Sequence, residues 1–468
     1  MEYIKKIEQM IDNKKNNYIN ISNKIWDFAE LSYEERKSSN LFGEVLESEG
    51  FEVTKNAGGI ETALIGSFGK GEPIIAFLGE YDALANLSQE KNATEYKPIT
   101  KNGNGHGCGH NLLGTGALAA AIAVKDYIVE NNLSGTIRFY GCPAEESGDG
   151  KTYMAREGLF DDVDFALTWH PKSVNAVSIM NALATYQVYF RFKGTSSHAS
   201  ISPHLGRSAL DAVEIMNVGV NYLREHIIPE ARVHYAVTNT GGSAPNVVQS
   251  EAEVMYLMRA PEVKEVEKIY ERIKKIAEGA SLITETKVEI EFDSGTSNLI
   301  KNETIDKVMI ENFKKLGTPK FTLDEVNFAK RIQQTIPEEN KEDLMDNSLK
   351  GATLAEDILP LSIDEKSSGS TDVADVSWIT PTSQVHTACM AIGTSLHSWQ
   401  AVSQVGTSIG HKGMIHASKV LATTAVDMLQ NKNLIEDAQK EKVEKLGQSK
   451  YISPIPKDVV APINRIKT

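Results

Sequence analysis

The sequence predicts an α/β fold, with a mostly parallel sheet that carries helices on both faces and an inserted ferredoxin-like α+β domain. Short apolar runs alternate with helical stretches in the first part of the chain, which is typical of a parallel sheet covered on both faces. The middle of the chain follows the order β-α-β-β-α-β. With 468 residues, the chain is long enough for two or three domains.

Three apolar runs bounded by Gly, Pro or charged residues predict buried strands at residues 74–78, 136–140 and 165–168. Residues 112–124 predict a buried helix, because this weakly polar stretch is too short to cross a bilayer. Polar residues follow each strand directly. Ligands of open α/β sheets bind at the carboxyl ends of the strands, so we expect these polar residues to meet in one crevice.

The middle of the chain changes character. Its expected elements are strands at residues 184–193, 232–238, 251–259 and 287–292, and helices at 205–226 and 263–283. Together they predict an inserted domain of about 110 residues, a usual domain size. A polar, acidic stretch over residues 330–366 is expected to form a surface excursion.

Composition narrows the class of partner. A formal net charge of -14 disfavours nucleic acid and anionic membranes, which need a basic surface. The N-terminus starts a charged amphipathic helix and has none of the features of a secretion signal. Three cysteines, an odd number in a long chain, favour a reducing environment without a disulfide framework. We therefore expect a cytoplasmic protein that binds cations and small molecules, with no nucleic acid or membrane partner.

Cys108 and His110 lie two residues apart in the glycine-rich segment 104–111, directly before the predicted buried helix. Glycines let the backbone fold tightly enough for both side chains to meet at one ion, and thiolate and imidazole suit zinc or manganese. Taken alone, the motif is equally compatible with a tight turn around a buried thiol. Further ligands elsewhere in the chain have to decide between the two.

Further candidate donors share a position beside an apolar strand or helix. Including the first two, the candidates are Cys108, His110, His170, His397 and one carboxylate of Glu145-Glu146. Five protein ligands exceed what one tetrahedral ion uses, so the set predicts a pair of ions. Six other histidines are expected to be mostly ordinary core or surface residues: His204, His226, His234, His386, His411 and His416.

The adjacent glutamates Glu145 and Glu146 can take two different roles in one site. If Glu146 binds metal, Glu145 points elsewhere and can take a proton from the attacking water and pass it to a leaving amine. The alternative is a solvated acidic turn. Because Pro143-Ala144 follows a buried strand immediately, we favour the site over the turn.

Several motifs resemble the metal-dependent aminoacylase and carboxypeptidase superfamily, in matching order over nearly the whole chain. They are Gly107-Cys108-Gly109-His110-Asn111, Pro143-Ala144-Glu145-Glu146, Ser197-His198-Ala199 with Pro203 and Gly206, and Gly241-Gly242 with Asn246-Val247-Val248. Within the branch that has a Cys-Gly-His motif, residues 369–373, 396–399, 411–414 and 451–456 are similar to those of the p-aminobenzoyl-glutamate hydrolases.

The resemblance implies two divalent metal ions per subunit, zinc or manganese, with Glu145 as the catalytic base. The implied metal ligands are Cys108, His110, Glu146, His170 and His397. Asp82 matches an acid that orients a ligand, while Glu80 stands where relatives have a histidine ligand. This branch is therefore expected to take its donors from the Cys-Gly-His motif, and Asp82 to hold an imidazole in position.

In the inserted domain, the resemblance implies that His198 stabilises the oxyanion of the tetrahedral intermediate, often from a partner subunit. Asn246 and Arg259 match positions that hold the carboxylate of the substrate, and guanidinium is well shaped for a two-point grip. From the residue alone, Arg259 at a strand end is equally compatible with an exposed ion pair.

The implied protein is a metal-dependent amidohydrolase that releases an amino acid from an acyl, aminoacyl or p-aminobenzoyl group, with metal-bound hydroxide as nucleophile. Residues 1–183 and 299–468, the second with a C-terminal extension, are expected to form the catalytic domain. Residues 184–298 are expected to form a lid and dimerisation domain that closes over the site, hinging near residues 184 and 298, and expels water.

Two alternatives stay open. One is a dipeptidase or N-acyl amino acid hydrolase without activity on p-aminobenzoyl-glutamate, and the other is a noncatalytic member of a heteromeric hydrolase. If the chain is itself an enzyme, the substrate is a small amide or dipeptide with a free carboxylate. Exposed edge strands of ferredoxin-like domains often pair, so we expect a homodimer, with a heteromer containing a paralogous chain as the alternative.

Overall fold

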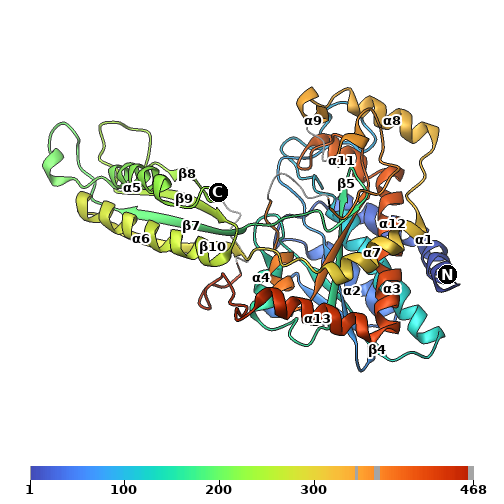
Figure 1. The fold of residues 1–468 in the computed structure, drawn as a ribbon. Helices are drawn as coiled ribbons and strands as arrows, with labels where there is room; N and C mark the ends of the chain where they lie inside the picture. The colour runs from blue at the N-terminus through green and yellow to red at the C-terminus, as the bar shows by residue number, and fades with distance from the viewer. Residues whose placement is uncertain (1, 343–345, 363–368, 462–468) are drawn as a thin grey trace.

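The computed structural model describes residues 2–342, 346–362 and 369–461, and it places them in two parts (Figure 1). The larger part contains a mixed α/β sheet with its helices. The smaller part is an antiparallel sheet with two helices that projects to one side. We call these the main domain and the lid.

The main sheet has seven strands, and its centre is parallel. In spatial order they are β1 (Glu52–Lys55), β2 (Leu64–Lys70), β4 (Gly135–Cys142), β3 (Ile74–Glu80), β5 (Phe165–Lys172), β11 (Thr382–Ala388) and β6 (Ala176–Val177). Strands β4, β3, β5 and β11 run parallel to one another, whereas β1, β2 and β6 pair antiparallel at the two edges. The mostly parallel sheet predicted from the sequence is confirmed.

Helices cover both faces of this sheet. The helices of the main domain are α1 (Glu2–Phe28), α2 (Arg36–Ser48), α3 (His110–Glu130), α4 (Gly150–Arg156), α7 (Glu303–Leu316), α8 (Leu323–Gln333), α9 (Glu338–Glu342), α10 (Val373–Ile379), α11 (Trp399–Val405), α12 (Ser408–Gln430) and α13 (Lys432–Leu446). Along β3, Ile75 and Phe77 join the core beneath α3 and α12, while Ala76 and Leu78 join the core on the opposite face with α4 and α10. The strand is thus buried on both sides, as its continuous apolar run predicts.

Helix α3 is the central helix of the main domain. It is long and apolar enough to cross a membrane, but 89% of its most apolar window is buried inside the fold. It packs on α1, α12 and β3. The helix begins at His110, and Gly109 just before it has a φ of 80°, a backbone conformation that glycine adopts without strain. The expected buried helix is therefore present, and it starts at a candidate site residue.

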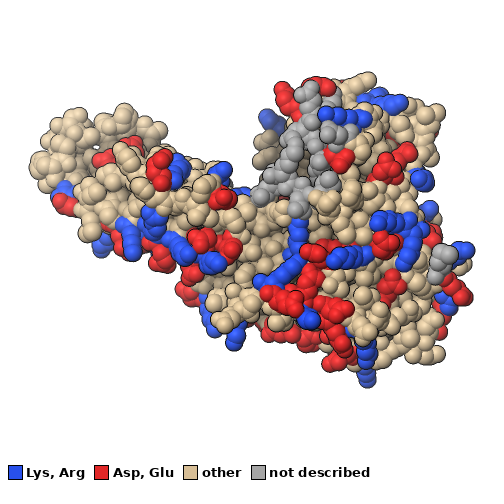
Figure 2. All heavy atoms as spheres, in the orientation of Figure 1, with Lys and Arg blue, Asp and Glu red and all other residues tan. Residues whose placement is uncertain are grey.

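The lid follows the predicted order β-α-β-β-α-β. Its elements are β7 (Ala184–Lys193), α5 (Ala209–Leu223), β8 (Arg232–Asn239), β9 (Glu251–Ala260), α6 (Val263–Thr284) and β10 (Lys287–Thr296). The sheet order is β10-β7-β9-β8, which leaves β8 as an exposed edge. Helices α5 and α6 pack on the sheet, and α6 lines the lower edge of the lid with interleaved Lys and Glu side chains (Figure 2).

The stretch over residues 330–366 differs from its prediction as a surface excursion. Its described residues include α9 and the buried side chains Leu349, Leu354 and Leu359, which belong to two small hydrophobic clusters. These leucines are spaced too irregularly among polar residues to reveal a buried face. Residues 343–345 and 363–368 lie outside the described residues.

Candidate metal centre

The candidate site lies where β3, β4 and β5 end. Glu80 is the last residue of β3, and Asp82 follows two positions later. Glu145 and Glu146 lie in the loop after β4, and His170 lies near the end of β5. The carboxyl ends of neighbouring parallel strands share one edge of the sheet, so these side chains are brought together from distant parts of the chain. His170 is within its strand, because β5 extends to Lys172 rather than ending at residue 168.

The glycine-rich loop delivers Cys108 and His110 to this edge. At Gly107, a Cβ atom would lie 2.6 Å from Leu87 Cδ1 and 3.2 Å from the backbone of His397, so the close approach of the two loops requires glycine. The His397 amide donates to the Gly107 carbonyl at 2.9 Å. The second loop, which lies between β11 and α11, is thereby fixed against the first, and its His397 joins the cluster.

Two groups of donors overlap at Cys108. The ligand atoms of Cys108, His110 and His170 lie within 4.8 Å of one another, and so do those of Cys108, Glu146 and His397. Cys108 Sγ is 3.3 Å from His170 Nε2, and His397 Nε2 is 3.2 Å from Glu146 Oε2. The structure therefore brings all five predicted donors together, with the thiol in the middle.

Hydrogen bonds orient two of the imidazoles toward the cluster. Nδ1 of His110 donates to Asp82 Oδ1 at 2.8 Å, and Nδ1 of His170 donates to the Pro171 carbonyl at 2.9 Å. With Nδ1 occupied, Nε2 of each ring faces the other donors and is the atom that would bind a cation. Asp82 thus contacts the imidazole that it was expected to orient.

Burial sets the protonation of the donors. Burial lowers the pKa of His170 well below its usual value, and the neighbouring His110 lowers it further, so this ring is neutral and able to ligate. Burial raises the pKa of the Cys108 thiol, as does the charge of Glu146. A cation beside Cys108 would reverse that effect and hold the sulfur as thiolate.

The residues fit a pair of divalent ions. Three polar atoms of the cluster are buried without a hydrogen-bond partner: Glu80 Oε2, His110 Nε2 and Glu146 Oε1. A folded protein rarely leaves such atoms unpaired, and a bound cation would satisfy them. Thiolate, imidazole and carboxylate are also the donor types that borderline divalent metals accept.

Glu145 lies beside the cluster and keeps some contact with solvent. Its side chain is 14% exposed, and its Oε2 atom is 4.0 Å from His110 Nε2. Burial raises the pKa of Glu145 well above its usual value, and the carboxylates Glu80 and Glu146 raise it further. A raised pKa makes a carboxylate a stronger base than one in water, which suits it to accept a proton.

The three candidates in the lid are not beside this cluster. His198 and Asn246 lie in loops at the far end of the lid, beyond Lys193 and before Glu251, whereas Arg259 lies at the end of β9 near the main domain. Strand β7 has ten residues and spans about 30 Å, so within one chain His198 is far from Cys108. Among the described residues Arg259 has no acidic partner, and burial lowers its pKa.

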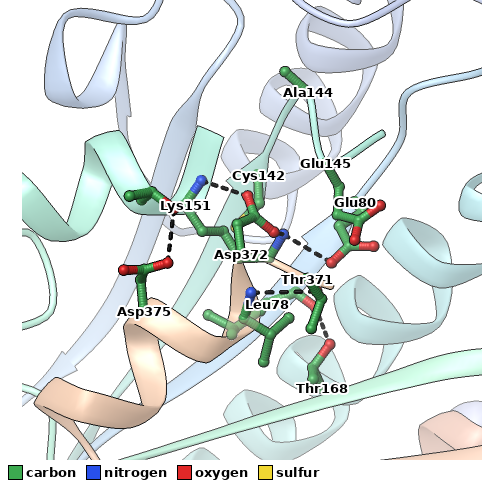
Figure 3. Close-up of polar contacts among 12 residues, drawn as sticks. Leu78, Glu80, Cys142, Ala144, Glu145, Lys151, Thr168, Thr371, Asp372 and Asp375 are labelled. Atoms are coloured by element: carbon green, nitrogen blue, oxygen red, sulfur yellow. Dashed lines mark hydrogen bonds and ion pairs between the residues drawn. The ribbon is translucent and has the colours of Figure 1, made fainter. Parts of the chain in front are cut away.

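Sequence reasoning missed part of the site. Lys151 in α4 lies fully buried between Glu80 and Asp372, which precedes α10 (Figure 3). A single lysine in a short polar helix gives no sequence signal, since it usually is solvated. Glu80, expected to be displaced by the Cys-Gly-His donors, lies within 4.8 Å of His110 and Glu145 as a third donor group.

Comparison with known proteins places these residues in a family. The profile of peptidase family M20/M25/M40 matches residues 76–359. The chain is 48% identical to one of the subunits of p-aminobenzoyl-glutamate hydrolase of Escherichia coli (strain K12), over 97% of each chain. It is 28% identical to Xaa-Arg dipeptidase of Mus musculus, over 92% of this chain and 90% of the relative.

A solved structure shares the fold. The crystal structure of a dinuclear metal-binding peptidase of the M20 family from Bacillus subtilis matches with a TM-score of 0.57 at 17% identity, covering 90% of this chain and 99% of that chain. The match shows that the two chains share a fold over most of their lengths.

Proposed function

This chain belongs to peptidase family M20/M25/M40 and is a metal-dependent amidohydrolase, and from that membership we propose that it hydrolyses p-aminobenzoyl-glutamate. The products would be p-aminobenzoate and glutamate. The 48% identity to a chain of the Escherichia coli p-aminobenzoyl-glutamate hydrolase, over nearly the full length of both chains, is the observation that carries this substrate.

We propose that Cys108, His110, Glu146, His170 and His397 hold the ions, with zinc favoured by the thiolate and three imidazoles and manganese as the alternative. When bound, divalent ions at such a centre supply Lewis acidity toward the scissile carbonyl and lower the pKa of water. Metal analysis of the freshly purified protein distinguishes zinc from manganese.

Glu145 is proposed as the proton carrier. Its Oε2 atom takes a proton from the attacking water and hands it to the amine of the departing amino acid. Its raised pKa, which makes the carboxylate a stronger base, and its contact with solvent support this role. Asp82 keeps His110 oriented through the 2.8 Å contact at Nδ1 and so serves the same step indirectly.

Residues of the lid are proposed to bind the substrate. Arg259 lacks an acidic partner among the described residues, so its guanidinium is available to hold the free carboxylate. Asn246 lies at the far end of the lid, as His198 does, so Asn246 would join Arg259 only from a second copy of the chain. The distance of His198 from the cluster supports its delivery by a second copy of the chain. We propose a homodimer paired through the exposed edge strand β8, where Tyr235 and Val237 are both exposed.

The relatives support one alternative substrate class and one alternative assembly. Similarity to Xaa-Arg dipeptidase supports dipeptides as an alternative substrate class. The 48% identical relative is named as one subunit of its enzyme, which supports a heteromer with a paralogous chain as the alternative assembly. We propose the cytoplasm as the location, because the three described cysteines are all unpaired and buried.

A substrate panel tests the proposal. The purified chain, loaded with zinc or manganese, is assayed with p-aminobenzoyl-glutamate, N-acyl amino acids and dipeptides, and release of the free amino acid is measured. We expect p-aminobenzoyl-glutamate to have the highest kcat/KM. Faster cleavage of dipeptides would favour the dipeptidase, and inactivity of a chain with two bound ions would favour a required sister chain.

A further inference from the structure

Lys151 is a buried lysine held between two buried carboxylates. Its Nζ lies 2.8 Å from Glu80 Oε1 and 2.6 Å from Asp372 Oδ1, and its side chain is 0% exposed (Figure 3). Lysine is almost never fully buried unless it is paired, because removing its charge from water is costly. The trio therefore has to be explained either by fold stability or by the neighbouring site.

Glu80 connects this trio to the metal centre. Its second oxygen, Oε2, has no hydrogen-bond partner and lies 3.3 Å from Nε2 of His110, which also has none. Because Nδ1 of His110 contacts Asp82, Nε2 is the ring atom that remains for a cation. Glu80 Oε2 and His110 Nε2 thus face each other in a buried space, an arrangement that a divalent cation between them would stabilise.

We propose that Lys151, anchored by Asp372, is a positioning residue of the metal centre: it holds Glu80 by Oε1 so that Oε2 faces the ion bound at His110 Nε2. Partners of this kind commonly orient carboxylates beside metals. The inference rests on the proposed two-ion centre, but it concerns how the site is held rather than which substrate is cleaved.

Asp372 makes a firm anchor. Its Oδ2 accepts the Lys151 backbone amide at 2.7 Å, while its Oδ1 accepts Nζ, so the lysine is held at both ends. One turn further along α10, Asp375 accepts from Thr152 at 2.8 Å and from Ser297, where the chain returns from the lid. Helices α4 and α10 are therefore fixed to each other beside the site.

A positioning role and a simple charge effect have opposite signs. Removing a positive charge near a cation site would by itself tighten cation binding. Removing the residue that orients Glu80 would instead weaken binding, because the freed carboxylate no longer faces the ion. Metal affinity therefore separates the two roles, and it does so without an activity measurement.

The test is Lys151→Met, titrated as metal-free protein with zinc against a competing chelator. We expect at least tenfold weaker binding of one ion, the usual effect of losing such a partner. Lys151→Arg is expected to restore most of the affinity. The matched control is Lys125→Met, since Lys125 is also buried and contacts two carboxylates, Glu49 and Asp126, but lies away from the site.

For Lys125→Met we expect lower stability with unchanged zinc affinity. Tighter or unchanged zinc binding in Lys151→Met would overturn the proposal. Lys151→Met leaves the carboxylates of Glu80 and Asp372 without their cation. If that variant does not fold, the double variant Lys151→Met/Asp372→Asn removes one of these two charges, and the same weakening of zinc binding is expected.

A second arm isolates Glu80. In a Glu80→Gln background, Lys151→Met is expected to change zinc affinity less than twofold, because the lysine acts through Glu80. An equal effect in both backgrounds would overturn the proposal. A native chain that binds two ions but cleaves no amide would contradict the proposed function, while these zinc titrations would still decide the role of Lys151.

Discussion

At Asp82 a single carboxylate connects the two sides of the candidate centre. Oδ1 contacts His110 Nδ1 at 2.8 Å, and Oδ2 accepts the backbone amide of Glu146 at 2.9 Å and the hydroxyl of Ser32 at 3.1 Å. Burial alone would raise the pKa of Asp82, but His110 and the amide lower it further than burial raises it. Asp82 therefore stays ionised and fixes one imidazole and the glutamate loop relative to each other.

Glu145→Gln tests the proposed base at this scale. The amide has the same size as the carboxylate but takes up no proton, so we expect kcat to fall about 100-fold or more. Metal content is expected to stay at two ions per chain. The measurement combines steady-state kinetics with elemental analysis of the same preparation.

Glu146→Gln is the paired variant. Because Glu146 is a proposed ligand, Glu146→Gln is expected to bind metal more weakly. Glu145→Gln is expected to bind metal as tightly as the native chain. Full activity in Glu145→Gln would exclude it as the base, and loss of metal in that variant would make it a ligand instead.

Individual site residues differed in how well the sequence predicted them. Cys108 and His110 share a glycine-rich motif, and the glutamate pair follows a buried strand, so a local pattern revealed each. Lys151 and Asp372 have no local pattern, because their pairing depends on two helices that meet only in the fold. The approach of Glu80 to His110 likewise depends on packing and not on spacing along the chain.

At the scale of elements, the first turn of α7 is held by a side chain from another helix. Glu441 in α13 accepts the backbone amides of Glu303 and Thr304 at 2.8 and 2.9 Å, and it pairs with Lys445 at 2.8 Å. Carboxylates at helix N-termini are stabilising because they satisfy free amides and the helix dipole. This contact therefore joins α7 to α13.

The pH dependence of this contact is predictable. Burial alone would raise the pKa of Glu441, but the hydrogen bonds from Lys445 and Thr304 outweigh it and lower the pKa to about 2. A depressed pKa means that the contact stabilises the fold above the unfolded-state pKa of about 4.3 and is lost as pH falls toward 2. Glu441→Gln is expected to cost about 1 to 2 kcal/mol at pH 7.

Urea unfolding of the two chains between pH 7 and pH 3 measures this difference. The stability gap should narrow below about pH 4.3, because the unfolded-state carboxylate begins to bind protons there while the native carboxylate stays ionised down to about pH 2. Glu444→Gln on the same helix is the control, because Glu444 forms an exposed ion pair with Lys440 at 3.9 Å. A gap that is constant with pH would show that the charge of Glu441 is not responsible.

Strand β11 shows why some elements escaped prediction. Its sequence, Thr-Ser-Gln-Val-His-Thr-Ala, is too polar to suggest a strand inside a buried sheet. The fold accommodates it because the hydroxyls are satisfied internally: Ser383 donates to Asp306, and Thr387 donates to the Gly413 carbonyl. The strands β3, β4 and β5 were predictable because each contains a short apolar run bounded by Gly, Pro or charged residues.

On the scale of the whole molecule, the lid projects away from the main domain, and its far loops carry His198 (Figure 1). If His198 acts in the site of a second copy of the chain, two inactive variants should complement each other. Mixed Glu145→Gln and His198→Ala chains are expected to recover about a quarter of native activity, because half the dimers are mixed and each has one complete site.

The mixture is prepared by dissociating and reassociating the two variants, and light scattering reports the size of the assembly. If reassociated dimers recover no activity, His198 acts in the site of its own chain or takes no part in the reaction. Charged substitutions at the exposed Tyr235 and Val237 on the edge strand β8 offer an independent way to separate the two chains.

Two-part organisation was predictable from the change in strand and helix pattern along the chain, because each part has its own periodicity. The orientation of the lid relative to the site was not predictable, because it depends on the two points where the chain passes between the main domain and the lid, near Leu183 and Ser297. Contacts far apart in sequence fix these crossings: Leu183 donates to the Gly369 carbonyl, and Ser297 donates to Asp375.

The central claim is that five side chains from separate loops and strand ends surround two divalent ions, with Glu145 left uncoordinated. A crystal of the zinc-loaded protein, with anomalous scattering recorded at the zinc edge, measures this directly. We expect two peaks about 3.5 to 4 Å apart, in contact with Cys108, His110, Glu146, His170 and His397. One peak alone, peaks remote from Cys108, or direct coordination by Glu145 would contradict it.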